Sequence, residues 1–305
     1  MRVSYIITTR DERPEILNAT LRALARTTSH VEGEIIVVDD GSQVPVQLPR
    51  GNSQLLRNAQ PRGVSPARRI GANAARGDVL VWLDAHMTFA DDWLDNMLPH
   101  AASGALLCSA FWDYELTLCH CWGANYLWCG ERDYFQQRYP GFGLRHRVSP
   151  PDSEVVDVPM IIGACYMLSR ASHKRLCGFS PLFRIWGIDE QDLCLRACLM
   201  GIPVRCVTTA RVGHLSRNAF PYPVGFEHLE FNQLVMIRSV FEASTIERLE
   251  RFFAPLPQTV TEWLEETDVQ GWRAEVQAGR VLSDRELLDA LGITLPVAGN
   301  LVFLQ

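Results

Sequence analysis

No apolar run in this sequence approaches the roughly 20 residues that a membrane-spanning helix needs. The first β-rich run already begins at Val3, which leaves no room for a signal peptide. Internal repeats and low-complexity segments are also absent. We therefore expect a cytoplasmic protein with no membrane span.

The sequence also lacks the positive charge that general nucleic-acid binding requires, because its formal net charge is −6. Its nine cysteines are an odd number at irregular spacing, which favours reduced thiols over a disulfide framework. The 305 residues are 47% hydrophobic and 21% charged, as in an ordinary globular protein. This length fits one large α/β domain, with or without an appendage.

Strand and helix patterns alternate at the start of the chain. Apolar, β-rich runs at residues 3–9 and 34–39 flank a stretch with helical spacing that begins near Pro14. Strand, helix and strand in this order predict a right-handed crossover and a parallel sheet. Ligands gather beyond the carboxyl ends of such strands. The polar residues at these ends are Thr8, Thr9, Arg10, Asp39 and Asp40.

The stretch from Gly77 to Met87 reads as a buried strand that ends in two potential metal ligands. Side chains two apart in an extended chain point to the same side, so Asp84 and His86 would emerge together. A carboxylate with an imidazole suits a divalent ion such as manganese. Such an ion can neutralise a departing diphosphate. From this stretch alone, a capping Asp and an unrelated His are the alternative.

A helix is expected just before this strand, with Ser65 as its N-cap and Pro66 in its first turn. Arg68 and Arg69 fall in that first turn, where positive charge opposes the helix dipole. Their position indicates an anionic ligand, with a solvated surface pair as an equal alternative.

Residues 112–157 form a long segment that is rich in Trp, Tyr, Cys and Arg. Long irregular segments are more often functional than not, and we expect Trp122, Tyr126 and Trp128 to stack on a sugar or a peptide. The cysteines between positions 119 and 129 lack the paired Cys-x-x-Cys spacing of a zinc site, so we interpret them as packing.

Asp189, Glu190 and Asp192 begin a helix after a Trp-Gly turn. Capping explains part of this cluster, because the helix dipole favours anions in the first turn. An acid cluster facing a metal–diphosphate site could also supply a general base. His214, taken alone, reads as a structural histidine.

Pro255 and Pro257 mark a boundary near the end of the chain. The segment that follows is acidic and has the spacing of short amphipathic helices. We expect it to cover the preceding domain or to mediate self-association as a homo-oligomer. It is too acidic for a membrane anchor.

Four motifs in order resemble nucleotide-sugar glycosyltransferases with the GT-A fold, of family 2 in general and of the polypeptide N-acetylgalactosaminyltransferases in particular. They are Ile-Ile-Val-Val-Asp-Asp-Gly-Ser, Leu-Asp-Ala-His, Trp-Gly-Ile-Asp-Glu-Gln-Asp-Leu and Arg-Val-Gly-His-Leu-Ser-Arg. The resemblance spans about Val3 to Arg238. It implies an α/β GT-A domain of residues 1–254, divided into a nucleotide-binding half (1–110) and an acceptor-binding half (111–254). An acidic helical extension of residues 255–305 follows.

The resemblance also implies site residues. Asp84 and His86 match the family's Asp-x-His metal site, and His214 matches its third ligand, for Mn²⁺ or Mg²⁺. The residues expected to hold the UDP-sugar are Thr8, Arg10, Glu12, Asp40, Arg68, Asp84 and Arg217.

The acid motif departs from the N-acetylgalactosaminyl enzymes, which resemble Trp-Gly-Gly-Glu-Asn and retain the anomeric configuration. Asp189-Glu190 is closer to the acid pair of inverting family 2 enzymes. We therefore expect inverting transfer of a sugar, such as an N-acetylhexosamine, to a hydroxyl of a glycan or peptide. In this interpretation Glu190 is the base, and Asp189 or Asp192 orients the acceptor.

Three alternatives remain: a retaining polypeptide N-acetylgalactosaminyltransferase-like enzyme, a non-catalytic nucleotide-sugar-binding protein on the same fold, and a nucleotidyltransferase. The last is disfavoured, because residues 8–12 lack the glycines of a phosphate-binding loop.

Overall fold

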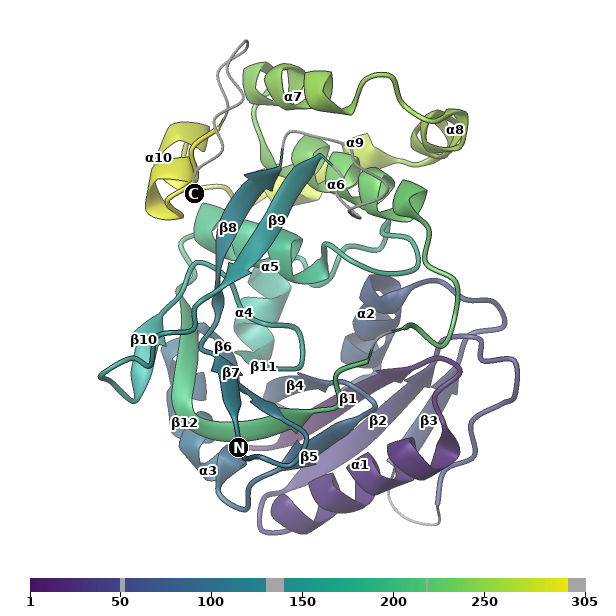
Figure 1. Ribbon diagram of the computed structural model, residues 1–305, viewed down its shortest axis with the longest axis vertical. Coiled ribbons are helices and arrows are strands. Elements are labelled where there is room, and N and C mark those ends of the chain that lie inside the picture. The colour runs from purple at the N-terminus through teal and green to yellow at the C-terminus, as the bar shows by residue number, and fades with distance from the viewer. Residues whose placement is uncertain (50–52, 130–139, 218, 296–305) are drawn as a thin grey trace.

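The computed structural model describes residues 1–49, 53–129, 140–217 and 219–295. They form a large central sheet with helices packed against both of its faces (Figure 1). Among the helices in these ranges, none combines the length and the apolar character that crossing a membrane requires.

The first four strands of the sheet are parallel. Their order is β3-β2-β1-β4, and helices α1 and α2 make crossovers between them. The bounds are β1 Val3–Thr9, α1 Pro14–Thr27, β2 Gly33–Asp39, β3 Ser53–Arg57, α2 Val64–Ala74 and β4 Val79–Leu83. This half of the sheet follows the parallel arrangement that the sequence predicts.

The rest of the sheet is mixed. Strand β11 lies antiparallel between β4 and β6, whereas β12 runs parallel to β6 and also pairs with β5. The strands here are β5 Met87–Phe89, β6 Leu106–Asp113, β7 Cys119–Cys121, β10 Val155–Asp157, β11 Cys165–Ser169 and β12 Val204–His214. The helices are α3 Trp93–Met97, η1 Leu98–Ser103, α4 Arg170–Arg175, α5 Asp189–Leu199 and α6 Phe226–Val240.

Alternation along the strands builds a core on each face of the sheet. In β1, Tyr5 and Ile7 join the core that includes residues of α1 and α3, and Ile6 joins the core that includes residues of α2, α5 and α6. Successive side chains of a strand point to opposite faces. Because both faces are covered, the central strands are apolar at nearly every position.

The aromatic segment after β6 is more regular than the sequence suggests. It contains a two-stranded ribbon of β8 Ala124–Cys129 and β9 Gly141–His146. The Tyr126 hydroxyl donates to the carbonyl of Gln191 at 2.7 Å, and Trp128 packs edge-on against Phe142 and Phe252. The predicted role of Tyr126 in sugar or peptide stacking is therefore wrong, because its ring is buried. For Trp122 and Trp128, which are partly buried against the core, it stays a prediction.

The C-terminal helices gather at one end of the molecule, beside the ribbon and opposite α1 (Figure 1). They are α7 Ala243–Glu250, η2 Arg251–Phe253, α8 Gln258–Glu266, α9 Val269–Ala278 and α10 Asp284–Ala290. Trp272 and Val276 of α9 belong to the same core as α6, and Arg273 donates to the Phe241 carbonyl at 2.6 Å. The apolar residues of the extension thus have partners within the chain. The division at residue 255 stays a prediction, as does the homo-oligomer, and residues 296–305 lie outside the described part.

Candidate metal and nucleotide site

Asp84 and His86 lie in a tight turn between β4 and β5. The buried hydroxyl of Thr20 in α1 donates to the Ala85 carbonyl at 3.1 Å and accepts the Met87 amide at 2.9 Å. The helix therefore fixes the backbone on both sides of His86. The two candidate ligands meet because of this turn and not because of strand alternation.

His214 arrives at the same place from the end of β12. The Leu215 amide donates to the His86 carbonyl at 3.0 Å, which ties the two segments together. His214 Nε2 lies 3.2 Å from Asp84 Oδ2 and 3.1 Å from His86 Nε2. All three ligand atoms lie within 4.8 Å of one another, as the sequence predicts.

These atoms have the chemistry of a divalent-cation site. His86 Nδ1 contacts Glu12 Oε2 at 3.1 Å, and this contact leaves Nε2 free for a metal if Nδ1 carries the proton. Two cis ligands of an octahedral ion at about 2.1 Å are about 3.0 Å apart, close to the separation of the two Nε2 atoms. Burial opposes the ionisation of Asp84, but the bond from His214 and the charge of Arg68 lower its pKa to about 2. A carboxylate and two imidazole nitrogens therefore fit such an ion.

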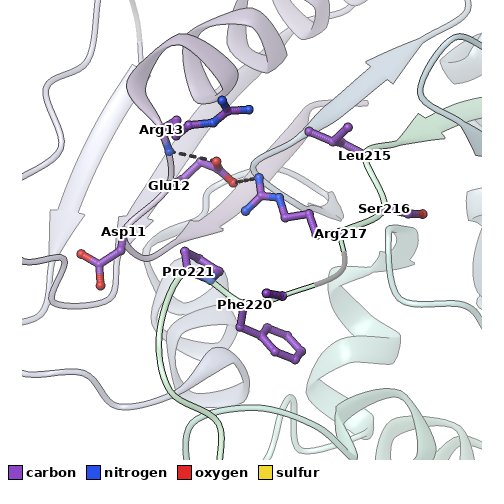
Figure 2. Close-up of a pocket in the computed structure, with 9 residues that line it drawn as sticks. Asp11, Glu12, Arg13, Leu215, Ser216, Arg217, Phe220 and Pro221 are labelled. Carbon is purple, nitrogen blue, oxygen red and sulfur yellow. Dashed lines mark hydrogen bonds and ion pairs between the residues drawn. The ribbon is translucent and has the colours of Figure 1, made fainter.

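Glu12 connects the metal cluster to the neighbouring cleft. Burial raises the pKa of Glu12, but its bonds with His86 and Arg217 outweigh burial and lower it. Figure 2 shows Glu12 between the Arg13 amide and the Arg217 guanidinium at the wall of this cleft, whose volume is about 410 Å³. Arg217 thus projects a positive charge beside the metal cluster, where a diphosphate would lie.

Arg68 joins the metal cluster to the candidate base. Its buried guanidinium lies 3.4 Å from Asp84 Oδ1 and 3.0 Å from Glu190 Oε1. It also lies over the rings of Tyr166 and Phe179. The predicted contact of Arg68 with the donor stays a prediction, because in this structure its charge is matched by two carboxylates.

Helix α2 begins two residues earlier than expected. Its N-cap is Gly63, and the Ser65 hydroxyl donates to the Ser180 carbonyl at 2.8 Å instead of capping the helix.

The acids of α5 occupy three different environments. Glu190 lies against Gly163, where a Cβ atom would come within 2.3 Å of Glu190 Oε1. Asp189 is buried, and burial raises its pKa despite the nearby Arg68. Asp192 is buried against Arg196, whose Nε donates to it at 2.9 Å. The predicted role of Asp192 in orienting an acceptor is therefore wrong, because its carboxylate is engaged inside the core.

The turn before these acids is strained. Ile188, the N-cap of α5, is buried and has a φ of 73°, a left-handed conformation that β-branched residues rarely adopt. Such strain persists where the surrounding structure enforces it, and it concentrates at functional sites. The motif Trp-Gly-Gly-Glu-Asn of the N-acetylgalactosaminyl enzymes has glycine at this position. Isoleucine at position 188 therefore adds backbone strain that glycine would avoid.

The predicted nucleoside residues lie at the ends of β1 and β2. Asp40 accepts the backbone amides of Arg62 and Gly63 at 2.9 and 2.8 Å, so it holds the loop before α2. The guanidinium of Arg10 lies 4.4 Å from the ring centroid of Tyr222. Burial raises the pKa of Tyr222 to about 12, and Asp84 and Asp40 lie within electrostatic range of it. Thr8 lies near the end of β1, in the same region.

Sequence reasoning missed Tyr222 and the exposed aromatic pair beside it. The rings of Trp186 and Phe220 lie 4.7 Å apart and are 38% and 46% exposed. Phe220 also lines the cleft of Figure 2. The Phe-Pro-Tyr-Pro run shortly after His214 is the one sequence signal that could have indicated them.

Two sequence families match the chain. The profile described as glycosyl transferase family 2 matches residues 4–176, and that of the N-terminal domain of galactosyltransferase matches residues 145–217. Polypeptide N-acetylgalactosaminyltransferase 14 of Homo sapiens is 29% identical over 249 residues, which are 72% of this chain and 41% of the relative. Polypeptide N-acetylgalactosaminyltransferase 3 of Drosophila melanogaster is 25% identical over 259 residues, or 78% and 38%. The matches thus span less than half the length of these relatives.

Among solved structures, the crystal structure of GalNAc-T7 with UDP, GalNAc and Mn²⁺ is similar, with a TM-score of 0.74 at 19% identity. The match covers 95% of this chain and 57% of that one. It confirms the predicted GT-A fold.

Proposed function

Because the chain belongs to glycosyl transferase family 2, we propose that it transfers a sugar from a UDP-sugar to a hydroxyl acceptor with the help of a divalent cation. The observation that carries this proposal is the convergence of Asp84, His86 and His214 beside the cleft that contains Glu12 and Arg217.

Different residues are proposed to bind the metal ion, the diphosphate and the nucleoside of the donor. Asp84, His86 and His214 would hold Mn²⁺ or Mg²⁺, and Glu12 orients His86. A bound ion would neutralise the charge that develops on the departing diphosphate. Arg217 adds a second positive charge on the cleft side. Thr8, Arg10 and Asp40 are the residues proposed to contact the nucleoside, around the half-buried ring of Tyr222.

The proposed acceptor is a hydroxyl of a glycan or peptide. Trp186 and Phe220 offer exposed ring faces at the mouth of the cleft, and aromatic faces suit the apolar face of a sugar or a peptide side chain. In the inverting reading Glu190 takes the acceptor proton, and Gly163 leaves room for its carboxylate to approach.

A retaining reaction like that of the named relatives is the second candidate. The observation in its favour is the similarity to polypeptide N-acetylgalactosaminyltransferases across most of the chain.

A donor screen tests the metal-dependent binding of a UDP-sugar, which the inverting and the retaining candidates share. The melting temperature is measured with UDP and with a panel of UDP-sugars, in Mn²⁺ and in a chelator, and UDP release is then assayed with the best donor. We expect UDP to stabilise the protein in Mn²⁺ only, because a ligand that binds the folded state raises its stability. Neither stabilisation nor UDP release in any metal would contradict the proposal.

A further inference from the structure

A second cavity, of about 520 Å³, lies between α2, α4 and α9 and shares no lining residue with the cleft of the metal site. Its residues come from far apart in the sequence. They are Arg69, Ala72, Asn73, Arg170, His173, Lys174, Cys177, Gly178 and Glu275, which together we call the basic pocket.

The charge of the basic pocket is unbalanced. Arg69, Arg170 and Lys174 bring three cations, and Glu275 is the one carboxylate in the lining. Within the described residues none of the three cations forms an ion pair; Arg69 and Arg170 donate to backbone carbonyls. An excess of unpaired positive charge stands out in a chain of net charge −6.

Helix dipole effects explain only part of this charge. His173, Lys174 and Arg175 lie in the last turn of α4, where cations stabilise a helix. Arg170 begins that helix, where the dipole opposes a cation, and Arg69 lies in the middle of α2, where the dipole does not favour a cation. The two arginines therefore need another reason to share a cavity.

Two buried polar atoms at the pocket lack a partner among the described residues, Arg170 Nη2 and His173 Nε2. A buried donor without a partner is costly, typically by about 1–3 kcal/mol. The imidazole is also adjacent to Arg69, because a Cβ atom on Gly178 would lie 3.0 Å from His173 Nε2 and 3.4 Å from Arg69 Nη1. Polar side chains from α2 and α4 thus meet at one wall of the cavity.

Lys174 is the only lysine in the sequence. It is exposed, and its ammonium group has no hydrogen bond or ion pair within the part of the chain that the structure describes. The ammonium group of Lys174 is therefore available to a ligand in the cavity.

We propose that the basic pocket binds a small oxyanion of the phosphate class, either free phosphate or the phosphoryl group of a small molecule. Guanidinium groups suit phosphate through paired N–H donors, and an ammonium group adds a point charge. The volume is in the range of small-molecule sites. This site is independent of the proposed transferase activity.

Calorimetry with inorganic phosphate and with pyrophosphate tests the proposal. The native protein is titrated in a chelator, at an ionic strength held constant with chloride so that screening does not change. The chelator removes the metal that would attract the probes to the transferase site. The arginines of that site are already paired: Arg68 with Asp84 and Glu190, and Arg217 with Glu12. We expect saturable binding to the native protein. Because pyrophosphate carries the higher charge, it should bind at least as tightly as phosphate if the pocket accepts a substituted phosphoryl group, and weaker binding of pyrophosphate would indicate free phosphate.

Three variants with single charge changes make the test specific. Lys174→Gln should weaken binding about fivefold and Glu275→Gln should tighten it by a similar factor, as expected for one nearby charge. Arg22→Gln, at an exposed position of α1 outside the pocket, should leave the affinity unchanged. No saturable binding to the native protein, or equal affinities in all three variants, would overturn the proposal.

Protection of the single lysine gives a second, independent measurement. Phosphate should slow the acylation of Lys174 by an amine-reactive ester, measured by mass spectrometry, and chloride at the same ionic strength should not. Equal rates in the two salts would contradict a ligand in contact with Lys174.

Discussion

Two neighbouring arginines of α2 lie at two sites that differ in their balance of charge. Arg68 is buried between Asp84 and Glu190, in a site that also contains two imidazoles and the ion pair of Glu12 with Arg217. Arg69 lines the basic pocket, where no carboxylate pairs with the cations of the described lining. The first site has an excess of groups that can bind a metal ion. The second has an excess of cationic groups that can donate hydrogen bonds to an anion. The balance of charge, rather than the residue type, thus indicates what each cavity binds.

Replacing Asp84 should have the largest effect and should separate the two cavities. Asp84→Asn removes the carboxylate ligand, and metal stabilisation of a leaving group is worth several kcal/mol, so we expect UDP release to fall about 1,000-fold. Phosphate binding in the basic pocket should be unchanged. The exposed substitution Asp152→Asn is the control for charge, and more than a tenth of the native rate in Asp84→Asn would contradict the metal site.

Replacing Glu190 should show which reaction the acid side of the site performs. Glu190→Gln keeps the shape of the side chain, and loss of a general base costs about 100-fold or more. In an inverting enzyme the rate should fall by this amount while the melting temperature stays close to native. A fall of less than about 10-fold, with a product of retained configuration by NMR, would favour the retaining candidate.

Gly163→Ala tests the same carboxylate without touching it. The added methyl group would displace Glu190, because its Cβ would lie 2.3 Å from Oε1. Gly143→Ala is the matched control, because its Cβ would meet one ordinary contact at 3.5 Å. We expect a loss of rate in the first variant only; equal rates would show that the position of Glu190 is unimportant.

Glu12 should matter less than the ligands themselves. Glu12→Gln weakens the partner that orients His86, and loss of such a partner typically costs 10- to 100-fold in metal affinity. We expect a weaker Mn²⁺ affinity in titrations followed by electron paramagnetic resonance, with part of the rate restored at high Mn²⁺. A native Mn²⁺ affinity in this variant would contradict a role of Glu12 in metal binding.

The smallest effect concerns pH and the basic pocket. Burial and the charges of Arg196, Arg69 and Arg170 lower the pKa of His173 from 6.5 to about 4. The unfolded chain therefore takes up a proton as the pH falls from 6.5 towards 4 while the folded chain does not, so stability declines in this window and levels off below it. Between pH 7 and 5.5 the loss should be about 1 kcal/mol.

Urea unfolding in chloride buffers measures this loss. His173→Phe should lose less stability than the native protein over the same pH interval, and identical pH profiles would contradict a buried, neutral His173.

The parts of the site that follow one strand could be predicted from the sequence, and the parts that depend on distant contacts could not. Asp84 and His86 stand out because they end a buried apolar run. His214 needed the family resemblance, because a single histidine at a strand end has no pattern of its own. Asp192 looked equivalent to Glu190, and only the buried bond from Arg196 separates them.

The basic pocket could not be predicted from the sequence either, because it also depends on contacts between distant parts of the chain. Its cations come from α2 and α4, about a hundred positions apart, and its carboxylate comes from α9. The sequence placed Arg68 and Arg69 in the first turn of a helix and so indicated an anion, whereas both lie in the middle of α2 and only Arg69 lines the basic pocket. No periodicity in the sequence records which helices meet in space.

The most direct test of the metal-dependent donor site is UDP titration calorimetry on the native protein and on His214→Ala. His214 is the ligand that joins the second half of the sheet to the Asp84 turn, so its loss should disable the cluster while the exposed control Asp152→Asn should not. We expect UDP to bind the native protein in Mn²⁺, and to lose that binding both in a chelator and in His214→Ala. Equal UDP affinity in Mn²⁺, in the chelator and in the variant would contradict a metal site formed by Asp84, His86 and His214.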